Sequence, residues 1–181
     1  VFIAGAAVQW LRDEVRLVSS APEADRVAET VPDTAGVHVV PAFTGLGAPW
    51  WDPGARGTVT GLTRGANRAH IIRATLESIG YQVADVVAAM ARDIRRPVRE
   101  LRADGGASRS RFLMQFQADI LGARIVLPAN AETTSAGAAF LAGLGAGIWS
   151  PPDLDRMRRV ARVYRPRMGP DRRREMLSAW H

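Results

Sequence analysis

The sequence predicts an α/β domain with a mainly parallel or mixed sheet and flanking helices. The first observation is a long stretch, 67–92, whose apolar residues keep helical spacing throughout: Ile72, Leu76, Ile79, Val83, Val86 and Met90. The second is that two short strand-like stretches, 98–103 and 124–127, are each followed by a helical pattern. Alternation of the two kinds of segment is typical of layered α/β domains.

The first third of the chain is expected to form two helices and two strands. An amphipathic helix is predicted by apolar residues that recur every three or four positions: Ala4, Val8, Leu11, Val15 and Val18. Pro22 suits the first turn of a second helix, which runs to about Thr30. The stretches 37–43 and 58–62 are predicted strands, and the loop 44–57 between them is rich in glycine and proline.

The central elements carry recognisable end signals. Asn67 is a plausible N-cap for the 67–92 helix. DGGAS at 104–108 is predicted to be a turn, in which Ser108 could cap the next helix. That helix ends at Gly122 and carries Phe112, Phe116 and Ile120 on one face.

The last elements are less regular. Thr133 or Thr134 is expected to cap a helix over SAGAAFLAGLGAG, whose small residues favour close helix packing. Beyond residue 150 the chain is rich in proline and arginine, with a short helix expected near 171–180.

Composition limits the classes of protein that fit. Apolar residues make up 47% of the 181 residues and charged residues 23%, which argues against general disorder. No apolar run reaches the length of a membrane span. There is no cysteine, hence no disulfide, thiolate metal site or cysteine nucleophile. The chain begins at Val1 rather than at a methionine, so we expect a piece of a longer protein.

The net charge of +6 is concentrated near one end. All 24 basic residues are arginine, and 151–181 holds nine of them against four acidic residues. The preceding residues are therefore nearly neutral, which does not favour a uniformly basic nucleic-acid surface. The arginine-rich end has few aromatic residues for base stacking, so we expect only weak, salt-sensitive binding to nucleic acid there.

Several common catalytic motifs are missing. The chain has no P-loop of the G-x-x-x-x-G-K-[ST] type, no G-x-G-x-x-G after a strand and no G-x-S-x-G elbow. Its histidines, His38, His70 and His181, lack the spacing of metal ligands.

Three features could still bind a ligand. The DGGAS turn (104–108) would let a ligand approach the backbone before a helix N-terminus, although its spacing alone slightly favours a plain tight turn. Gly5 and Gln9 lie one helical turn apart opposite the apolar stripe, where a gap beside an amide could hold a ribose or base, although the spacing alone favours ordinary helix surface. The 44–57 loop carries adjacent tryptophans that must pack against something, and its Asp52 is best read as a turn residue.

Longer blocks resemble a known family. Five successive stretches of this chain resemble the C-terminal half of the FGGY carbohydrate kinases, and most closely the branch that phosphorylates glycerol. They are FIAGAAVQWLRD (2–13), PAFTGLGAPWWDPGARG (41–57), GLTRGANRAHIIRATLESIGYQ (61–82), DGGASRSRFLMQFQADILG (104–122) and ETTSAGAAFLAG (132–143). The stretch 61–78 resembles the family-wide signature. TGLGAPWWD is the block that points to glycerol, because other sugar kinases of the family usually differ there.

The resemblance implies an actin/hexokinase-like ATPase domain of ribonuclease-H topology. Residues 1–149 would be the C-terminal nucleotide-binding domain, and 150–181 an arginine- and proline-rich extension. The implied reaction is ATP- and Mg²⁺-dependent phosphorylation of glycerol to glycerol 3-phosphate by a cytoplasmic, homo-oligomeric enzyme. The N-terminal domain would supply the catalytic aspartate and most glycerol contacts, so no residue of this chain is assigned as catalytic or as a metal ligand. We therefore expect the isolated chain to be inactive.

The resemblance also suggests which residues meet the nucleotide. Gly5 and Gln9 match a glycine and a glutamine of the nucleotide pocket, and Gly106 matches the glycine that approaches the nucleotide. Ser110 stands where the family usually has an asparagine on the adenine side. A serine cannot present an amide to the base, which places that contact in question.

Two alternatives remain open at this point. The acceptor could be another polyol or sugar, because most acceptor contacts would lie outside this chain. The chain could also be a non-catalytic nucleotide-binding fragment, for which the departure at Ser110 is the main argument.

Overall fold

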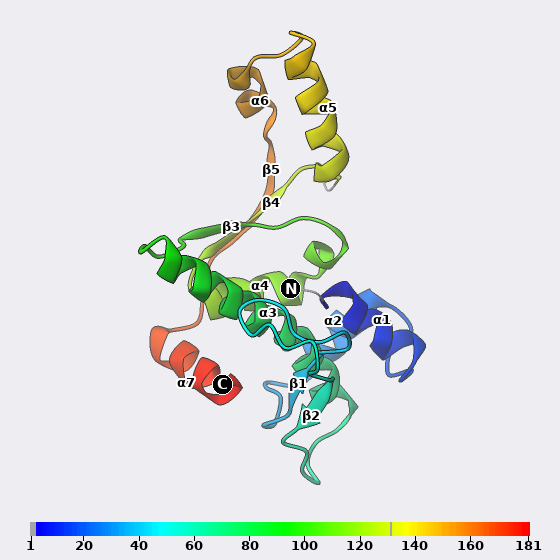
Figure 1. The fold of residues 1–181 in the computed structure, drawn as a ribbon. Helices are drawn as coiled ribbons and strands as arrows, with labels where there is room; N and C mark the ends of the chain where they lie inside the picture. The colour runs from blue at the N-terminus through cyan, green and yellow to red at the C-terminus, as the bar shows by residue number, and fades with distance from the viewer. Residues whose placement is uncertain (1–2, 131) are drawn as a thin grey trace.

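The computed structural model describes residues 3–130 and 132–181, in which helices and strands alternate as predicted (Figure 1). In chain order the elements are α1 (Gly5–Asp13), α2 (Ala21–Ala28), β1 (His38–Val40), β2 (Thr58–Thr60), α3 (Arg68–Asp93), β3 (Glu100–Arg102), the short 3₁₀ helix η1 (Gly106–Arg109), α4 (Arg111–Leu121), β4 (Arg124–Pro128), α5 (Thr133–Gly145), α6 (Pro151–Met157), β5 (Val160–Tyr164) and α7 (Pro170–Trp180). No helix in the described part of the chain is long and apolar enough to cross a membrane.

The main sheet is mixed and has the order β3-β4-β5. β3 and β4 are parallel, with Leu101 opposite Ile125, whereas β5 returns antiparallel to β4 with Val163 opposite Val126. β1 and β2 form a separate antiparallel pair. Sequence patterning did not predict β5, which lies in the arginine-rich C-terminal stretch.

The long helix α3 forms the centre of the core. Ile72 and Leu76 pack against α1 and α2, and Ile79 packs against α4 and the sheet. The predicted cap is confirmed: the Asn67 side chain accepts a hydrogen bond from Ala69 N at 2.9 Å. Because this 26-residue helix contacts α1, α2 and α4, it holds them in fixed positions.

Two helix ends differ from the prediction. The first helix ends at Asp13 rather than running to Val18, because Arg16 takes a left-handed backbone conformation with φ 55°. Val18 is nevertheless buried in the core. The cap of α4 is Ser110 and not Ser108, because Ser108 Oγ instead donates to Gly105 O at 2.7 Å inside the η1 turn.

Helix α5 also departs from the expectation. Neither Thr133 nor Thr134 caps it: Glu132 occupies the N-cap position without a side-chain hydrogen bond. Close helix packing was expected, yet only Gly143 of this helix is buried, against the ring of Trp149. In Figure 1, α5 and α6 project from the rest of the molecule as an arm, and Leu141 on α5 is 71% exposed.

The C-terminal stretch returns to the body of the protein. Asp119 Oδ1 at the end of α4 accepts from the backbone N of Arg167 at 2.5 Å and of Met168 at 3.1 Å. Trp180 of α7 stacks on Tyr81 of α3 at 4.9 Å between ring centroids. The division at residue 149 stays a prediction, but 150–181 contributes a strand of the sheet and a helix packed on α3 and α4.

Candidate functional site

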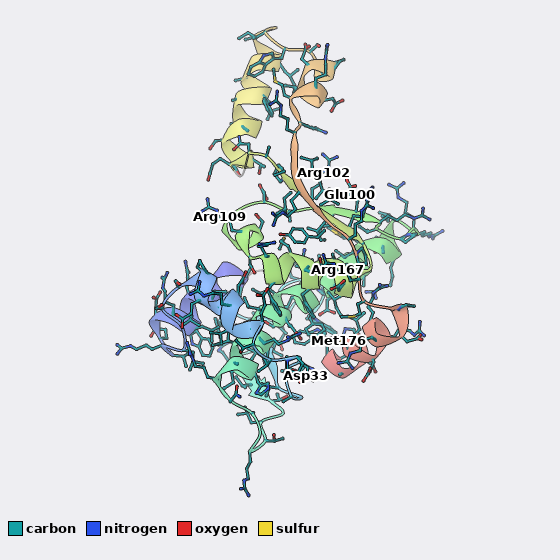
Figure 2. All side chains as sticks on the ribbon, turned by 180° about the vertical axis from the view of Figure 1, so that it is seen from behind. Asp33, Glu100, Arg102, Arg109, Arg167 and Met176 are labelled. Atoms are coloured by element: carbon teal, nitrogen blue, oxygen red, sulfur yellow. The ribbon has the colours of Figure 1, made fainter. Side chains whose placement is uncertain are left out.

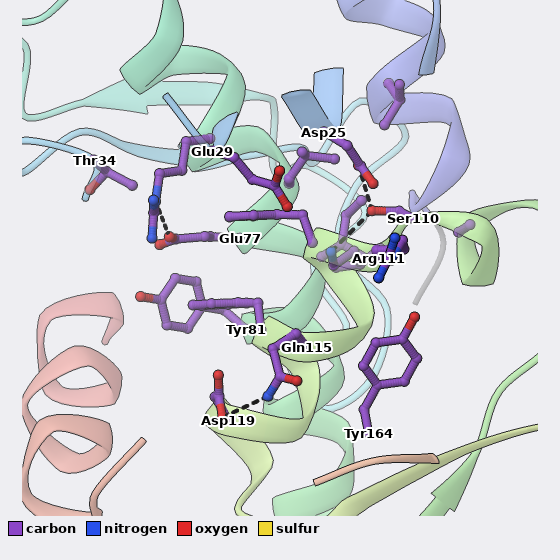
Figure 3. A pocket seen from close by; sticks show the side chains of 18 of the residues that line it. Asp25, Glu29, Thr34, Glu77, Tyr81, Ser110, Arg111, Gln115, Asp119 and Tyr164 are labelled. Atoms are coloured by element: carbon purple, nitrogen blue, oxygen red, sulfur yellow. Dashed lines mark hydrogen bonds and ion pairs between the residues drawn. The ribbon is translucent and has the colours of Figure 1, made fainter. Parts of the chain in front are cut away.

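A cleft of about 1850 Å³ runs along α4 and is walled by α1, α2, α3, β5 and α7. All four residues that the sequence suggested for nucleotide contact line it: Gly5, Gln9, Gly106 and Ser110. Figure 3 shows its interior, and Figure 2 labels Arg109 and Arg167, which line it near opposite ends of α4. Residues from opposite ends of the chain therefore meet at one surface.

Gly5 and Gln9 form one wall of the cleft. Gly5 is the first residue of α1, and Gln9 lies one turn later on the same exposed side. A Cβ added at Gly5 would meet no atom within 4 Å, so the space beside its Cα is open. Both residues thus lie on the cleft with open space beside Gly5, and their contact with a nucleotide stays a prediction.

The DGG turn forms the adjoining wall. Gly105 has φ 79°, a backbone conformation that glycine tolerates far better than other residues. A Cβ at Gly106 would also meet nothing within 4 Å. The longer helix was expected directly after this turn. The four-residue helix η1 comes first, and α4 begins only at Arg111.

The hydroxyl of Ser110 is already engaged on both sides. It accepts from Leu113 N at 3.0 Å, which caps α4, and donates to Asp25 Oδ1 of α2 at 2.6 Å (Figure 3). This contact joins residues 85 positions apart in the chain. Sequence analysis did not identify Asp25, since no local pattern distinguishes it from an ordinary surface residue of α2.

A buried ion pair supports the floor of the cleft. Glu77 Oε1 accepts from Arg73 Nε at 2.7 Å, and their side chains are 3% and 17% exposed. Burial raises the pKa of the Glu77 carboxyl, and Arg73 opposes that rise. Burial also raises the pKa of the neighbouring Tyr81 phenol. Arg73 additionally donates to Val31 O at 2.5 Å, which fixes the loop after α2.

Positive charge gathers along the rim of the cleft. Arginines from η1, α4, β5 and the stretch after it line this surface: Arg109, Arg111, Arg162, Arg165 and Arg167. Arg162 also lies over the Tyr164 ring at 5.8 Å. Because β5 was not predicted from sequence, neither was the contribution of its residues to the cleft. Such a rim attracts anionic ligands.

The 44–57 loop does not line this cleft. Asp52 Oδ1 accepts from Gly54 N at 2.8 Å and from Ala55 N at 3.1 Å, which is the turn role that the sequence favoured. The expected packing of both tryptophans was wrong for Trp51, which is 71% exposed; Trp50 is 55% exposed, and its Nε1 donates to Asp85 Oδ2 at 3.4 Å. Trp180 Nε1 and His181 Nε2 also contact the Asp85 carboxylate, at 3.0 and 2.9 Å.

No metal centre is found in residues 3–130 and 132–181: no three His, Cys, Asp or Glu side chains are grouped to hold an ion. His70 Nδ1 accepts from Asn67 N at 3.1 Å in the cap of α3, and His38 contacts Gly36 O. These two histidines therefore have structural partners.

The chain is similar to known carbohydrate kinases over its whole length. Residues 1–146 match the C-terminal domain of the FGGY family of carbohydrate kinases. Glycerol kinase 1 of Clostridium tetani is 53% identical over the whole chain, and glycerol kinase of Halorhodospira halophila is 51% identical over 99% of it. The chain spans 36% of the length of each of these relatives.

Solved structures agree with the sequence matches. Glycerol kinase of Plasmodium falciparum with ADP superimposes with a TM-score of 0.88 and 37% identity, over 97% of this chain and 35% of that one. Xylulose kinase of Lactobacillus acidophilus gives 0.82 and 26% identity, over 97% of this chain and 36% of that one. The predicted fold class, an actin/hexokinase-like α/β domain, is confirmed by these neighbours. The chain belongs to the FGGY family of carbohydrate kinases and contains its C-terminal domain.

Proposed function

We propose that this chain is the nucleotide-binding half of a glycerol kinase, which transfers the γ-phosphoryl group of ATP to a terminal hydroxyl of glycerol. The observation that carries the proposal is the 53% identity to a glycerol kinase over the whole chain. Identity to the xylulose kinase of similar fold is about half as high, at 26%.

The cleft along α4 is the proposed nucleotide site. The open space beside Gly5 and Gly106 would let a ligand lie against the backbone, and the Gln9 amide can hydrogen-bond at its edge. Arginines of the rim would attract the phosphates. The neighbour with the TM-score of 0.88 was solved with ADP, which supports nucleotide binding by a protein of this fold.

Phosphoryl transfer depends on positioning and charge stabilisation, together with a base near the acceptor hydroxyl. The described residues supply positioning and positive charge, but we assign no base among them. The Asp52 carboxylate is held by two turn amides, away from the cleft. Mg²⁺ would accompany the nucleotide; because the described residues form no group that could hold a metal, no step is assigned to it.

The partners that this proposal implies are ATP or ADP in the cleft and glycerol between this domain and the N-terminal domain. Oligomerisation and a cytoplasmic location belong to the same proposal. Both are implied by the family resemblance of the sequence.

A coupled assay that follows ADP release tests the activity. It is run on the longest polypeptide that the gene encodes, which we call the long form. The acceptors are glycerol, xylulose and gluconate. We expect glycerol to give the highest kcat/KM. A higher value for xylulose or gluconate would refute glycerol as the substrate. Absence of turnover with every acceptor, combined with retained ADP binding, would favour the non-catalytic alternative.

The same assay on residues 1–181 alone tests whether catalysis needs residues outside this chain. We expect these residues to release no ADP above background with glycerol. Glycerol-dependent turnover by this chain would show that the catalytic base lies within it.

A further inference from the structure

The side chain of Asp25 enters the proposed nucleotide cleft from α2. Its Oδ1 accepts a hydrogen bond from Ser110 Oγ at 2.6 Å, and the residue is partly buried (Figure 3). Within residues 3–130 and 132–181 its side chain takes part in this one hydrogen bond and in no ion pair, and the second oxygen, Oδ2, is not involved. One carboxylate oxygen therefore fixes α2 to α4, and the other remains available to a ligand.

The hydroxyl of Ser110 has little hydrogen-bonding capacity left for a nucleotide base. A serine hydroxyl has one proton to donate, and Asp25 receives it. The oxygen also accepts from Leu113 N in capping α4. Position 110 therefore cannot donate to a base, and its remaining capacity is a single lone pair. The free acceptor beside it is the carboxylate of Asp25.

We propose that Asp25 selects the base of the phosphoryl donor by accepting a hydrogen bond from the 6-amino group of adenine. This inference rests on the proposed nucleotide site. An ionised carboxylate only accepts hydrogen bonds, so it attracts the adenine amino group and repels the 6-keto oxygen of hypoxanthine or guanine. The charge on the acceptor makes such a hydrogen bond stronger than one between neutral groups. Base selection is thereby carried by the carboxylate that α2 presents to the cleft.

The test compares two nucleotides on the long form by calorimetry. ADP carries the 6-amino group, and IDP carries a keto oxygen in its place. Wild-type protein should bind ADP about tenfold or more tightly than IDP, which is the lower end of what a charged hydrogen bond provides. Purine riboside diphosphate, which has only hydrogen at that position, should fall between the two. These comparisons need no variant and so do not depend on the folding of one.

Three variants separate selection from structure. Asp25→Asn should bring the ADP/IDP ratio within about threefold, because an amide can rotate to accept or to donate. Ser110→Ala removes the contact but keeps the carboxylate, so the preference for ADP should persist. Asp33→Asn is the matched control, since Asp33 lines the same cleft and its Oδ1 accepts from Ala35 N at 2.8 Å. It should leave the ratio unchanged.

The outcomes distinguish this inference from the proposed function. If wild-type protein binds neither nucleotide, the cleft is not a nucleotide site and both proposals fail. If ADP and IDP bind equally well, or if Asp25→Asn and Ser110→Ala weaken both nucleotides to the same degree, Asp25 has only a structural role. Either result would overturn the inference and leave the nucleotide site standing.

Discussion

Gly5 offers a test of the nucleotide site that does not disturb the fold. Valine at this position would direct a branched side chain into the cleft, yet a Cβ there meets no protein atom within 4 Å. Valine has a better helix propensity than glycine, so folding should be unaffected or improved by a few tenths of a kcal/mol. A ligand lying against the backbone would be displaced. Loss of one hydrogen bond to a charged ligand costs about 1.5–3 kcal/mol, or roughly 10- to 100-fold in affinity.

The assay is calorimetric titration of the long form of Gly5→Val with ADP, together with its thermal unfolding. Gly137→Val is the matched control, because Gly137 also lies in a helix with open space beside it but on α5, away from the cleft. We expect at least tenfold weaker ADP binding for Gly5→Val only, with unfolding temperatures equal to wild type or slightly higher. Unchanged ADP affinity in Gly5→Val would refute the placement of the nucleotide beside α1.

The remaining predictions concern stability and use denaturant unfolding. Arg73→Met should cost about 3–5 kcal/mol near neutral pH, because it leaves the buried Glu77 carboxylate without its partner. Since burial raises the pKa of Glu77 in the folded protein, this variant should regain stability on acidification and lose it as the pH rises through that pKa. A loss of unfolding free energy that does not depend on pH would contradict this role of Glu77. Gly122→Ala should cost about 1–2 kcal/mol or more, because Gly122 has φ 64° and packs against the Arg173 guanidinium, whereas Gly137→Ala should be neutral or stabilising. Asp85→Ala should cost about 2 kcal/mol by leaving the Trp180 indole N–H without its acceptor, and an unchanged unfolding midpoint would show that water replaces the carboxylate.

Local sequence patterns predicted the elements whose signals are themselves local. The spacing of Ile72, Leu76 and Ile79 and the cap at Asn67 identified α3 within a residue or two of its observed ends. The choice between Ser108 and Ser110 as a cap failed because both hydroxyls can bond to nearby backbone, and η1 decides which one does. Strand β5 was missed because its pairing partner β4 lies more than 30 residues away and its residues are mostly exposed.

The candidate site was predictable only in part for the same reason. Gly5 and Gly106 could be found because family motifs surround them, and the structure brings both to one cleft. Asp25 and Tyr164 reach that cleft through tertiary contacts of α2 and β5, which leave no periodic signal in the sequence. The small-residue face of α5 resembles an interior surface, yet it stays exposed in a chain that spans 36% of its relatives' length.

A crystal structure of the long form with bound ADP would test the central claim most directly. The account predicts that the nucleotide lies in the cleft along α4, against Gly5 and Gly106, with its base beside Asp25 and Ser110. ADP bound elsewhere, for example against the 44–57 loop with this cleft filled only by solvent, would contradict it.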